Sequence, residues 1–238
     1  ALLSGGIIGL RQPEVNIQTV TVRGTHYANE QILRHLINNA LAGHYLFFIP
    51  KTSTFLYPRQ AIERDALALF PAVESLDIRR DSFTALSVFV LERKTDALWC
   101  HSFASTSPCY LMDETGVVFE KTDTRYESLI TYTGPMGAGS PLGAAFMSGD
   151  YPALRVFVHD IERATGRTAR TVSLDEHEDI TVMFGEGGEL RYARKDASDA
   201  LLQNIASVFA SSRFRSDDEL EYADFRFGNK VYVKFREE

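Results

Sequence analysis

The stretch SLDEHEDI holds the densest group of side chains that could do chemistry. Around His177 it places Asp175, Glu176, Glu178 and Asp179. Carboxylate and imidazole groups bind metal ions and act as general acids and bases. Consecutive residues of a turn point in different directions, however, so these side chains are not expected to converge on one ion or substrate. The stretch is predicted to be an acidic, solvated loop.

The remaining patterns do not assemble a catalytic site. His35 and His44 do not share a helical face, and neither GAGSPLG nor GEGGE is followed by the Lys-Ser/Thr of a phosphate-binding loop. The serines lack the context of a nucleophile elbow. We therefore predict a protein that is not an enzyme, with no catalytic residue, metal, cofactor or small-molecule substrate. A periplasmic hydrolase would be favoured only if a pocket gathered carboxylates or His residues.

The two cysteines lie close together in LWCHSFASTSPCYLMDETG. Cys100 and Cys109 each adjoin a strand-like run, and a hairpin would bring them opposite one another. Two states are open from the residues alone: a disulfide in an oxidising compartment, and two reduced cysteines in a cytosolic hairpin. The chain has no CxxC, and metal-ligand spacing is absent.

The final stretch, YADFRFGNKVYVKFREE, alternates between apolar and polar side chains. This is the period of a β-strand with one apolar face and one basic, aromatic face. Gly228-Asn229 in its middle is a hairpin-turn dipeptide. A two-residue turn there would put Phe227 beside Lys230 and mix the two faces. We therefore predict one continuous strand, in which Gly228 and Asn229 mark a weak point or bulge.

Such a terminal strand would join a sheet along one side and leave its other side unpaired. Arg226, Lys230 and Lys234 would protect this edge from indiscriminate pairing. The same charges would favour an acidic partner strand added by β-augmentation, with Tyr222 and Tyr232 as anchors. The alternative is a strand that only completes the fold. The predicted partner-binding residues are Tyr222, Asp224, Arg226, Phe227, Gly228, Asn229, Lys230, Tyr232 and Lys234.

The first ninety or so residues have the pattern of a small two-layer α+β domain. Asn29 is a candidate N-cap before a helical stripe of apolar residues, and Pro58 can open a second helix. The predicted elements are a strand over 16–24, helices over 29–41 and 58–70, and strands over 72–80 and 85–93. Their order is β-α-α-β-β.

After Arg93 the chain changes to short strands in quick succession. A Gly/Pro-rich connector over 134–152 leads to a helix that ends at Gly166, a natural C′ residue. Asp196 is a candidate cap for a second helix, which would run to about Phe214. This half is predicted to be a mostly antiparallel β domain with two helices.

Composition limits the partners and the domain count. The chain has 238 residues, of which 45% are hydrophobic, and this allows one or two folded domains. Its net charge of -7 argues against a nucleic-acid partner. Ala1–Leu10 is uncharged and too short to cross a bilayer alone, since a span needs about 20 apolar residues. It is either a disordered or locally packed N-terminus, or the outer end of a transmembrane helix that stops before Arg11.

Five stretches carry a family pattern in a fixed order. The matching positions are Val15, Ile17, Val20, Val22 and Gly24; Pro71 and Val73; Glu92, Arg93, Ala97 and Trp99; Asp113 and Gly116; and Asp224, Arg226 and Phe227. The positions before residue 94 make the first domain look like a POTRA domain. From Val15 to Phe235, the chain resembles the extracytoplasmic part of the FtsQ/DivIB family of bacterial cell-division proteins.

The resemblance implies a fold and a place in the cell. The expected fold is α+β, with an N-terminal POTRA domain (β-α-α-β-β) followed by a mostly antiparallel β domain with two helices. Residues 1–13 would be the end of a truncated transmembrane segment and its linker, 14–93 the POTRA domain, and 94–238 the β domain with its C-terminal edge strand. The chain would lie on the extracytoplasmic side of the cytoplasmic membrane, where a Cys100–Cys109 disulfide is expected.

The resemblance also implies a function. The protein would be a non-catalytic, single-pass scaffold that recruits FtsB/DivIC-like and FtsL-like division proteins, which in turn regulate septal peptidoglycan synthesis. The alternative is a POTRA-bearing component of outer-membrane protein assembly or secretion, a class expected to have several POTRA units followed by barrel strands. The strand Val73–Arg80 is expected at a sheet edge, where Arg79 and Arg80 would form a secondary docking surface, or else a purely structural edge.

Overall fold

The computed structural model describes residues 12–104, 106–137, 139–211, 220–228 and 230–236. Over these residues the fold is mixed α+β, with four α-helices and one large, mostly antiparallel sheet. Two compact units divide between Arg93 and Lys94. Residues 1–13 were predicted to be the end of a membrane span and its linker, and residues 1–11 of this segment lie outside the described residues. Within them, no helix has the length and apolar character that a bilayer crossing needs.

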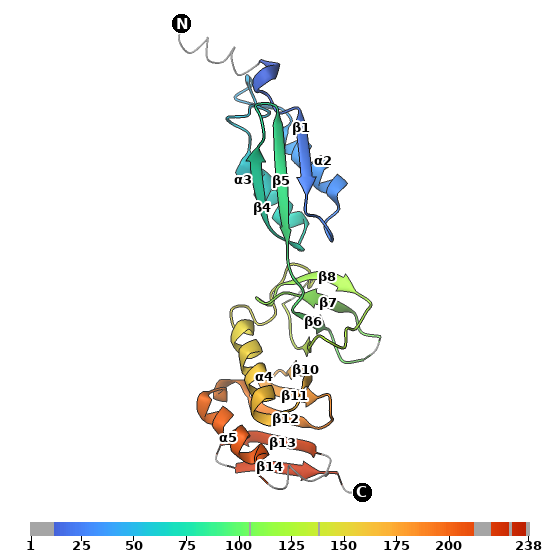
Figure 1. Ribbon diagram of the computed structural model, residues 1–238, viewed down its shortest axis with the longest axis vertical. Coiled ribbons are helices and arrows are strands. Elements are labelled where there is room, and N and C mark those ends of the chain that lie inside the picture. The colour runs from blue at the N-terminus through green and yellow to red at the C-terminus, as the bar shows by residue number, and fades with distance from the viewer. Residues whose placement is uncertain (1–11, 105, 138, 212–219, 229, 237–238) are drawn as a thin grey trace. The chain divides into compact units, whose positions relative to one another are not determined.

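The first unit is a three-stranded sheet with two helices (Figure 1). The strand order is β1-β5-β4, with β1 parallel and β4 antiparallel to the central β5. Apolar residues of both helices and of the three strands share one core. The elements are η1 (Pro13–Val15), β1 (Thr19–Arg23), α2 (Glu30–Leu41), β2 (His44–Tyr45), β3 (Ile49–Pro50), α3 (Arg59–Leu69), β4 (Val73–Arg80) and β5 (Ala85–Glu92).

Local signals in the sequence account for how these elements join. The Asn29 side chain accepts a hydrogen bond from the Ile32 backbone N–H and so caps α2, as predicted. The Glu92 carboxylate accepts backbone N–H groups of residues 26–28, which ties the end of β5 to the loop before α2. Gly24 has a φ of +90°, and a Cβ there would lie 2.4 Å from the Val90 carbonyl oxygen. Glycine is therefore required at this position.

The second unit is built on a nine-stranded sheet of order β14-β13-β12-β11-β10-β9-β6-β7-β8. Neighbouring strands are antiparallel except in the pairs β6–β9, β9–β10 and β12–β13. The elements are β6 (Ala97–Cys100), β7 (Cys109–Met112), β8 (Val118–Thr122), β9 (Thr131–Thr133), α4 (Tyr151–Thr165), β10 (Ala169–Leu174), β11 (Asp179–Phe184), β12 (Glu189–Ala193), η2 (Arg194–Asp196), α5 (Asp199–Phe209), β13 (Leu220–Phe227) and β14 (Lys230–Phe235).

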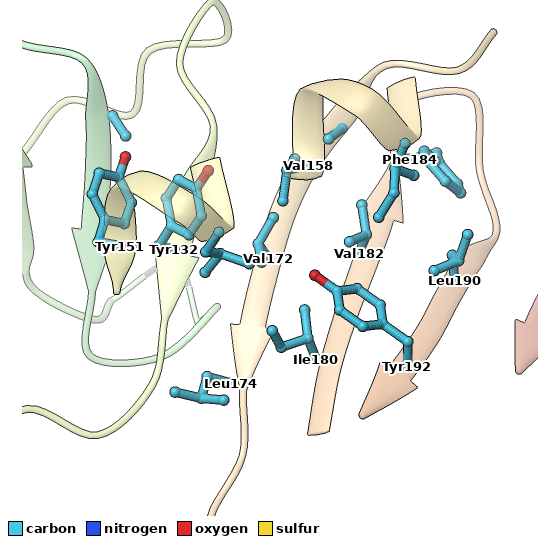
Figure 2. Close-up of a cluster of buried hydrophobic side chains, with 14 of the residues drawn as sticks. Tyr132, Tyr151, Val158, Val172, Leu174, Ile180, Val182, Phe184, Leu190 and Tyr192 are labelled. Carbon is cyan, nitrogen blue, oxygen red and sulfur yellow. The ribbon is translucent and has the colours of Figure 1, made fainter. Parts of the chain in front are cut away.

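The two helices of this unit cover one face of the sheet. Val158 of α4 lies over Val172 and Val182 of the sheet, and the Tyr132 and Tyr151 rings pack edge to face at 5.1 Å (Figure 2). The α5 cap is Ser198, whose hydroxyl accepts from the Leu201 N–H. The predicted cap, Asp196, belongs instead to the preceding 3-10 turn. The opposite face of the sheet carries the site described below.

A disulfide closes the β6–β7 hairpin. Cys100 and Cys109 are directly opposed in the antiparallel register, with their Cα atoms 4.2 Å apart, and their sulfurs are bonded. Both side chains are buried. The cross-link therefore lies inside the second unit, and it also limits the conformations of the unfolded chain.

Loss of this disulfide should destabilise the second unit. For a closed loop of about ten residues, the chain-entropy model gives about 2.7 kcal/mol. We expect the Cys100→Ala/Cys109→Ala variant to lose roughly that free energy of unfolding in urea. Trp99, the only tryptophan, is buried in the second unit, so its emission reports the transition. Native protein whose two thiols alkylate freely, or an oxidised protein no more stable than the reduced one, would contradict the prediction.

The prediction of one continuous terminal strand is wrong. The chain reverses at Gly228, which has a φ of +62°, and β13 and β14 form an antiparallel hairpin in which Phe227 pairs with Lys230. Asn229 lies outside the described residues. The Gly-Asn dipeptide therefore does what its turn propensity indicates.

A β-bulge removes the objection that favoured the continuous strand. Between the pairs Asp224–Tyr232 and Phe227–Lys230, β13 has one residue more than β14. The extra residue shifts the register so that Ala223 faces Val233 on the core side, and Asp224 faces Tyr232 on the other side. The apolar face is thus preserved through the turn. Phe227, predicted to face the core, is instead 55% exposed.

Candidate protein-binding edge

The β14 strand forms one edge of the nine-stranded sheet. In the described part of the chain it pairs with β13 alone. Its exposure alternates along the strand. Lys230, Tyr232 and Lys234 are exposed, whereas Val231, Val233 and Phe235 are partly buried against the core. An edge strand of this kind presents backbone N–H and C=O groups on one side and a regular pattern of side chains on its faces.

Most of the predicted partner-binding residues lie on the hairpin, but they do not all lie on its edge. Tyr222, Asp224, Arg226 and Phe227 belong to β13, whose backbone is paired with both β12 and β14. On the outer face, the Phe227 and Tyr232 rings meet edge to face at 5.0 Å. The Lys234 ammonium pairs with Glu221 at 2.8 Å. The hairpin therefore brings an aromatic pair and two lysines to its outer face and edge.

Arg226 is engaged within the fold rather than presented at the edge. Its guanidinium donates to Asp224 at 2.6 and 2.9 Å and to Asp179 of β11 at 2.8 Å. Asp224 is only 4% exposed. Burial alone would raise the pKa of Asp224, but the hydrogen bonds and positive charge of Arg226 outweigh it and hold that pKa below its usual value. The same two carboxylates raise the pKa of Arg226.

Sequence reasoning did not find Arg191 of β12. Its guanidinium lies over the Tyr222 ring, 5.2 Å from the centroid, and its backbone is in register with Asp224. The alternation of ELRYA indicates an outward-facing Arg191, but its neighbour depends on the parallel register of β12 and β13. That register joins segments separated by a helix, and no local pattern specifies it.

The acidic stretch near His177 is a turn whose carboxylates have separate tasks. Asp175 accepts the backbone N–H groups of His177 and Asp179. Glu178 pairs with Arg194, and Asp179 with Arg226. Among the described residues, no three His, Cys, Asp or Glu side chains lie close enough together to hold a metal ion.

A hollow of about 560 Å³ opens at the ends of β6, β9 and β10. Aromatic, proline and glycine residues form most of its lining, together with His101, Asp175 and Glu176. Among the residues that the structure describes, no hydrogen bond joins the side chains of these three residues, and Asp175 is occupied by the turn. Asp175 therefore takes part in the turn rather than in a hydrogen-bonded pair with His101 or Glu176.

Arg79 and Arg80 lie on β4, an edge strand of the first unit's sheet. Arg79 pairs with Asp77 on its own strand and lies over the Phe89 ring at 5.2 Å. Arg80 lies over both Phe55 and Phe83, at 5.6 and 5.7 Å. Both side chains are exposed. They are thus held against aromatic rings, and their role in docking stays a prediction.

No protein-family model and no curated protein matches this chain. In the described part of the chain, the β14 edge and its outer face offer a strand that pairs only with β13, an exposed aromatic pair and two lysines. This arrangement is suited to binding an extended peptide strand.

Proposed function

We propose that this protein is a non-catalytic scaffold of the bacterial division machinery, similar to FtsQ/DivIB, which binds its partners by adding a strand at β14. The partners would be FtsB/DivIC-like and FtsL-like single-span proteins, through which the scaffold influences septal peptidoglycan synthesis. The chain would lie on the outer side of the cytoplasmic membrane. The observation that carries the proposal is the terminal strand of a large sheet, which pairs on one side only among the described residues.

The first unit supports the family resemblance through its topology. We infer that it is a POTRA domain, because its order β-α-α-β-β and its β1-β5-β4 sheet with both helices contributing to one core have the arrangement expected of that class. The family positions also have structural tasks here. Gly24 allows the close approach to Val90, and Glu92 holds the loop before α2.

The edge is suited to one particular class of partner strand. Lys230 places a positive charge at the start of β14, within a chain of net charge -7, whereas the ammonium of Lys234 at the other end pairs with Glu221. An acidic strand would therefore be favoured over a second copy of this acidic protein. Tyr232 and Phe227 provide the aromatic anchor beside it.

Charge reversal at β14 tests this proposal. The chain is used to capture single-span division proteins from solubilised membranes, and these are identified by mass spectrometry. We expect Lys230→Glu to reduce capture about tenfold, because a lost attraction becomes a repulsion beside the partner strand. The control is Lys121→Glu, an exposed lysine on β8 at the opposite edge of the same sheet.

Full capture by Lys230→Glu, or an equal loss with Lys121→Glu, would contradict the proposal.

The double variant Arg79→Glu/Arg80→Glu tests the secondary docking surface in the same assay. We expect this variant to lose less capture than Lys230→Glu does. Unchanged capture would show that β4 is a purely structural edge.

A further inference from the structure

The loop between β2 and β3 exposes large apolar side chains in a strained backbone. Leu46 is 72% and Phe47 98% exposed. Their φ angles are +48° and +70°, in the left-handed region that bulky residues rarely adopt. Glycine would relieve this strain at both positions. The fold therefore holds two apolar side chains in water at a conformational cost, a combination that marks functional loops.

A second exposed apolar group lies in the same unit. The Phe55 and Phe83 rings are 5.8 Å apart, and both are more than half exposed. The Arg80 guanidinium lies over both rings. This cation and its aromatic neighbours form a surface that is apolar and positively charged at once.

Chain segments that follow or flank both groups hydrogen-bond to the segment with which the described chain begins. Residues 15–17 hydrogen-bond to residues 52–54, directly after the β2–β3 hairpin, and Gln18 bonds to Thr84 beside Phe83. Figure 1 shows this end of the unit next to η1, where the described chain begins. Residues 1–10 of the sequence, ALLSGGIIGL, are uncharged. The segments next to the exposed apolar side chains thus adjoin the first described residues, which follow this apolar stretch in the sequence.

The segment that holds the β2–β3 hairpin differs in charge from the whole chain. Between Glu30 and Glu63 the sequence contains no acidic residue, although the chain has 32 of them. Arg34 and Arg59 pair with the flanking glutamates. Lys51, 5.8 Å from the Tyr45 ring, is the cation that directly follows the hairpin. Aromatic residues with nearby cations are the composition of segments that bind at the surface of an anionic membrane.

We propose that this end of the first unit contacts an anionic bilayer, with Leu46 and Phe47 inserted among the lipid headgroups. Phe55, Phe83 and Arg80 form a second contact. A side chain that protrudes as far as Phe47 can enter the headgroup region of a bilayer without a preformed pocket. The proposed scaffold function requires only attachment to a membrane by a span. The present inference adds direct contact between the folded unit and the membrane, and it rests on that function only for the choice of membrane.

Vesicle flotation tests this contact without any protein partner. The full chain is mixed with phosphatidylcholine vesicles that contain or lack phosphatidylglycerol. We expect Phe47→Asp to lower the partition coefficient about tenfold or more, because a buried aromatic side chain becomes a charge. Val156→Asp is the control, since Val156 is also apolar and more than half exposed but lies on α4 of the second unit. Lys51→Glu should weaken binding only to vesicles that contain phosphatidylglycerol.

Residues 1–10 are the same in every variant, so differences in partition measure the contribution of the loop. A Phe47→Trp variant should bind at least as well as the wild type, and vesicles should shift its emission to shorter wavelength. The buried Trp99 provides a constant background. Equal partition of wild type and Phe47→Asp, or an equal loss with Val156→Asp, would overturn the inference. Partner capture is measured separately at β14, so either proposal can fail while the other holds.

Discussion

Proline at one of two adjacent positions of β14 should weaken partner binding strongly while leaving the protein folded. Neighbouring residues of a strand point their N–H groups to opposite sides. Of Tyr232 and Val233, one therefore donates toward β13 and the other toward the open edge. Proline at the outward position removes one donor and places its ring in the path of an added strand. The expected loss of affinity is at least about tenfold, from roughly 1 kcal/mol for the hydrogen bond together with the steric clash.

The two proline variants should separate binding from stability. The variant at the inward position breaks a bond within the hairpin and should lower the urea midpoint, followed by Trp99 emission. The variant at the outward position should keep the wild-type midpoint and lose the captured division proteins. If both variants keep the midpoint and both capture partners fully, strand addition at β14 is excluded. If both unfold, the Lys230→Glu variant provides the independent test.

Signals within a few residues of one another were sufficient to predict much of the fold. Asn29 caps α2, and Gly166 ends α4 in the left-handed conformation. Cys100 and Cys109 face each other across the hairpin that their flanking runs indicate. In each case the deciding interaction spans less than one helix or hairpin, so the sequence pattern contains it.

The terminal hairpin shows where this reasoning fails. Strict alternation predicted one strand, because a single extra residue in β13 cannot be recognised from parity. The chain reverses at Gly228, and with the bulge in β13 the apolar face is kept while Phe227 is exposed. The sequence patterns also gave no assignment for YLFFIP, where the structure exposes Leu46 and Phe47 in a loop between β2 and β3.

The role of Arg226 could not be predicted either, and it leads to the second large effect. Asp179 lies 47 residues before Arg226 in the sequence, and only the order β13-β12-β11 brings them together. Arg226 was expected to protect an edge, but it neutralises the buried Asp224. Its removal should therefore affect stability first and partner binding only as a consequence.

We expect Arg226→Leu to lower the free energy of unfolding of the second unit by about 3 kcal/mol at pH 7, because it leaves Asp224 buried without its cation. The change would be measured by urea unfolding with Trp99 emission. The double variant Asp224→Asn/Arg226→Leu is the matched control. The double variant removes the buried charge as well. Its loss of unfolding free energy should therefore be smaller than the sum of the losses in the single variants Asp224→Asn and Arg226→Leu.

The pH dependence of this variant identifies the charge that is responsible. In the wild type the pKa of Asp224 is lowered in the folded state, so its contribution to stability is complete at neutral pH and is lost as the pH falls below about 4. Without Arg226, burial raises that pKa above its unfolded value. The variant is then destabilised at neutral pH and recovers as acid protonates Asp224. The difference in stability between the two proteins should shrink steadily from pH 7 toward pH 4. A constant difference over this range would show that Arg226 acts through packing, and a fully stable variant that captures no partner would place Arg226 in the binding site after all.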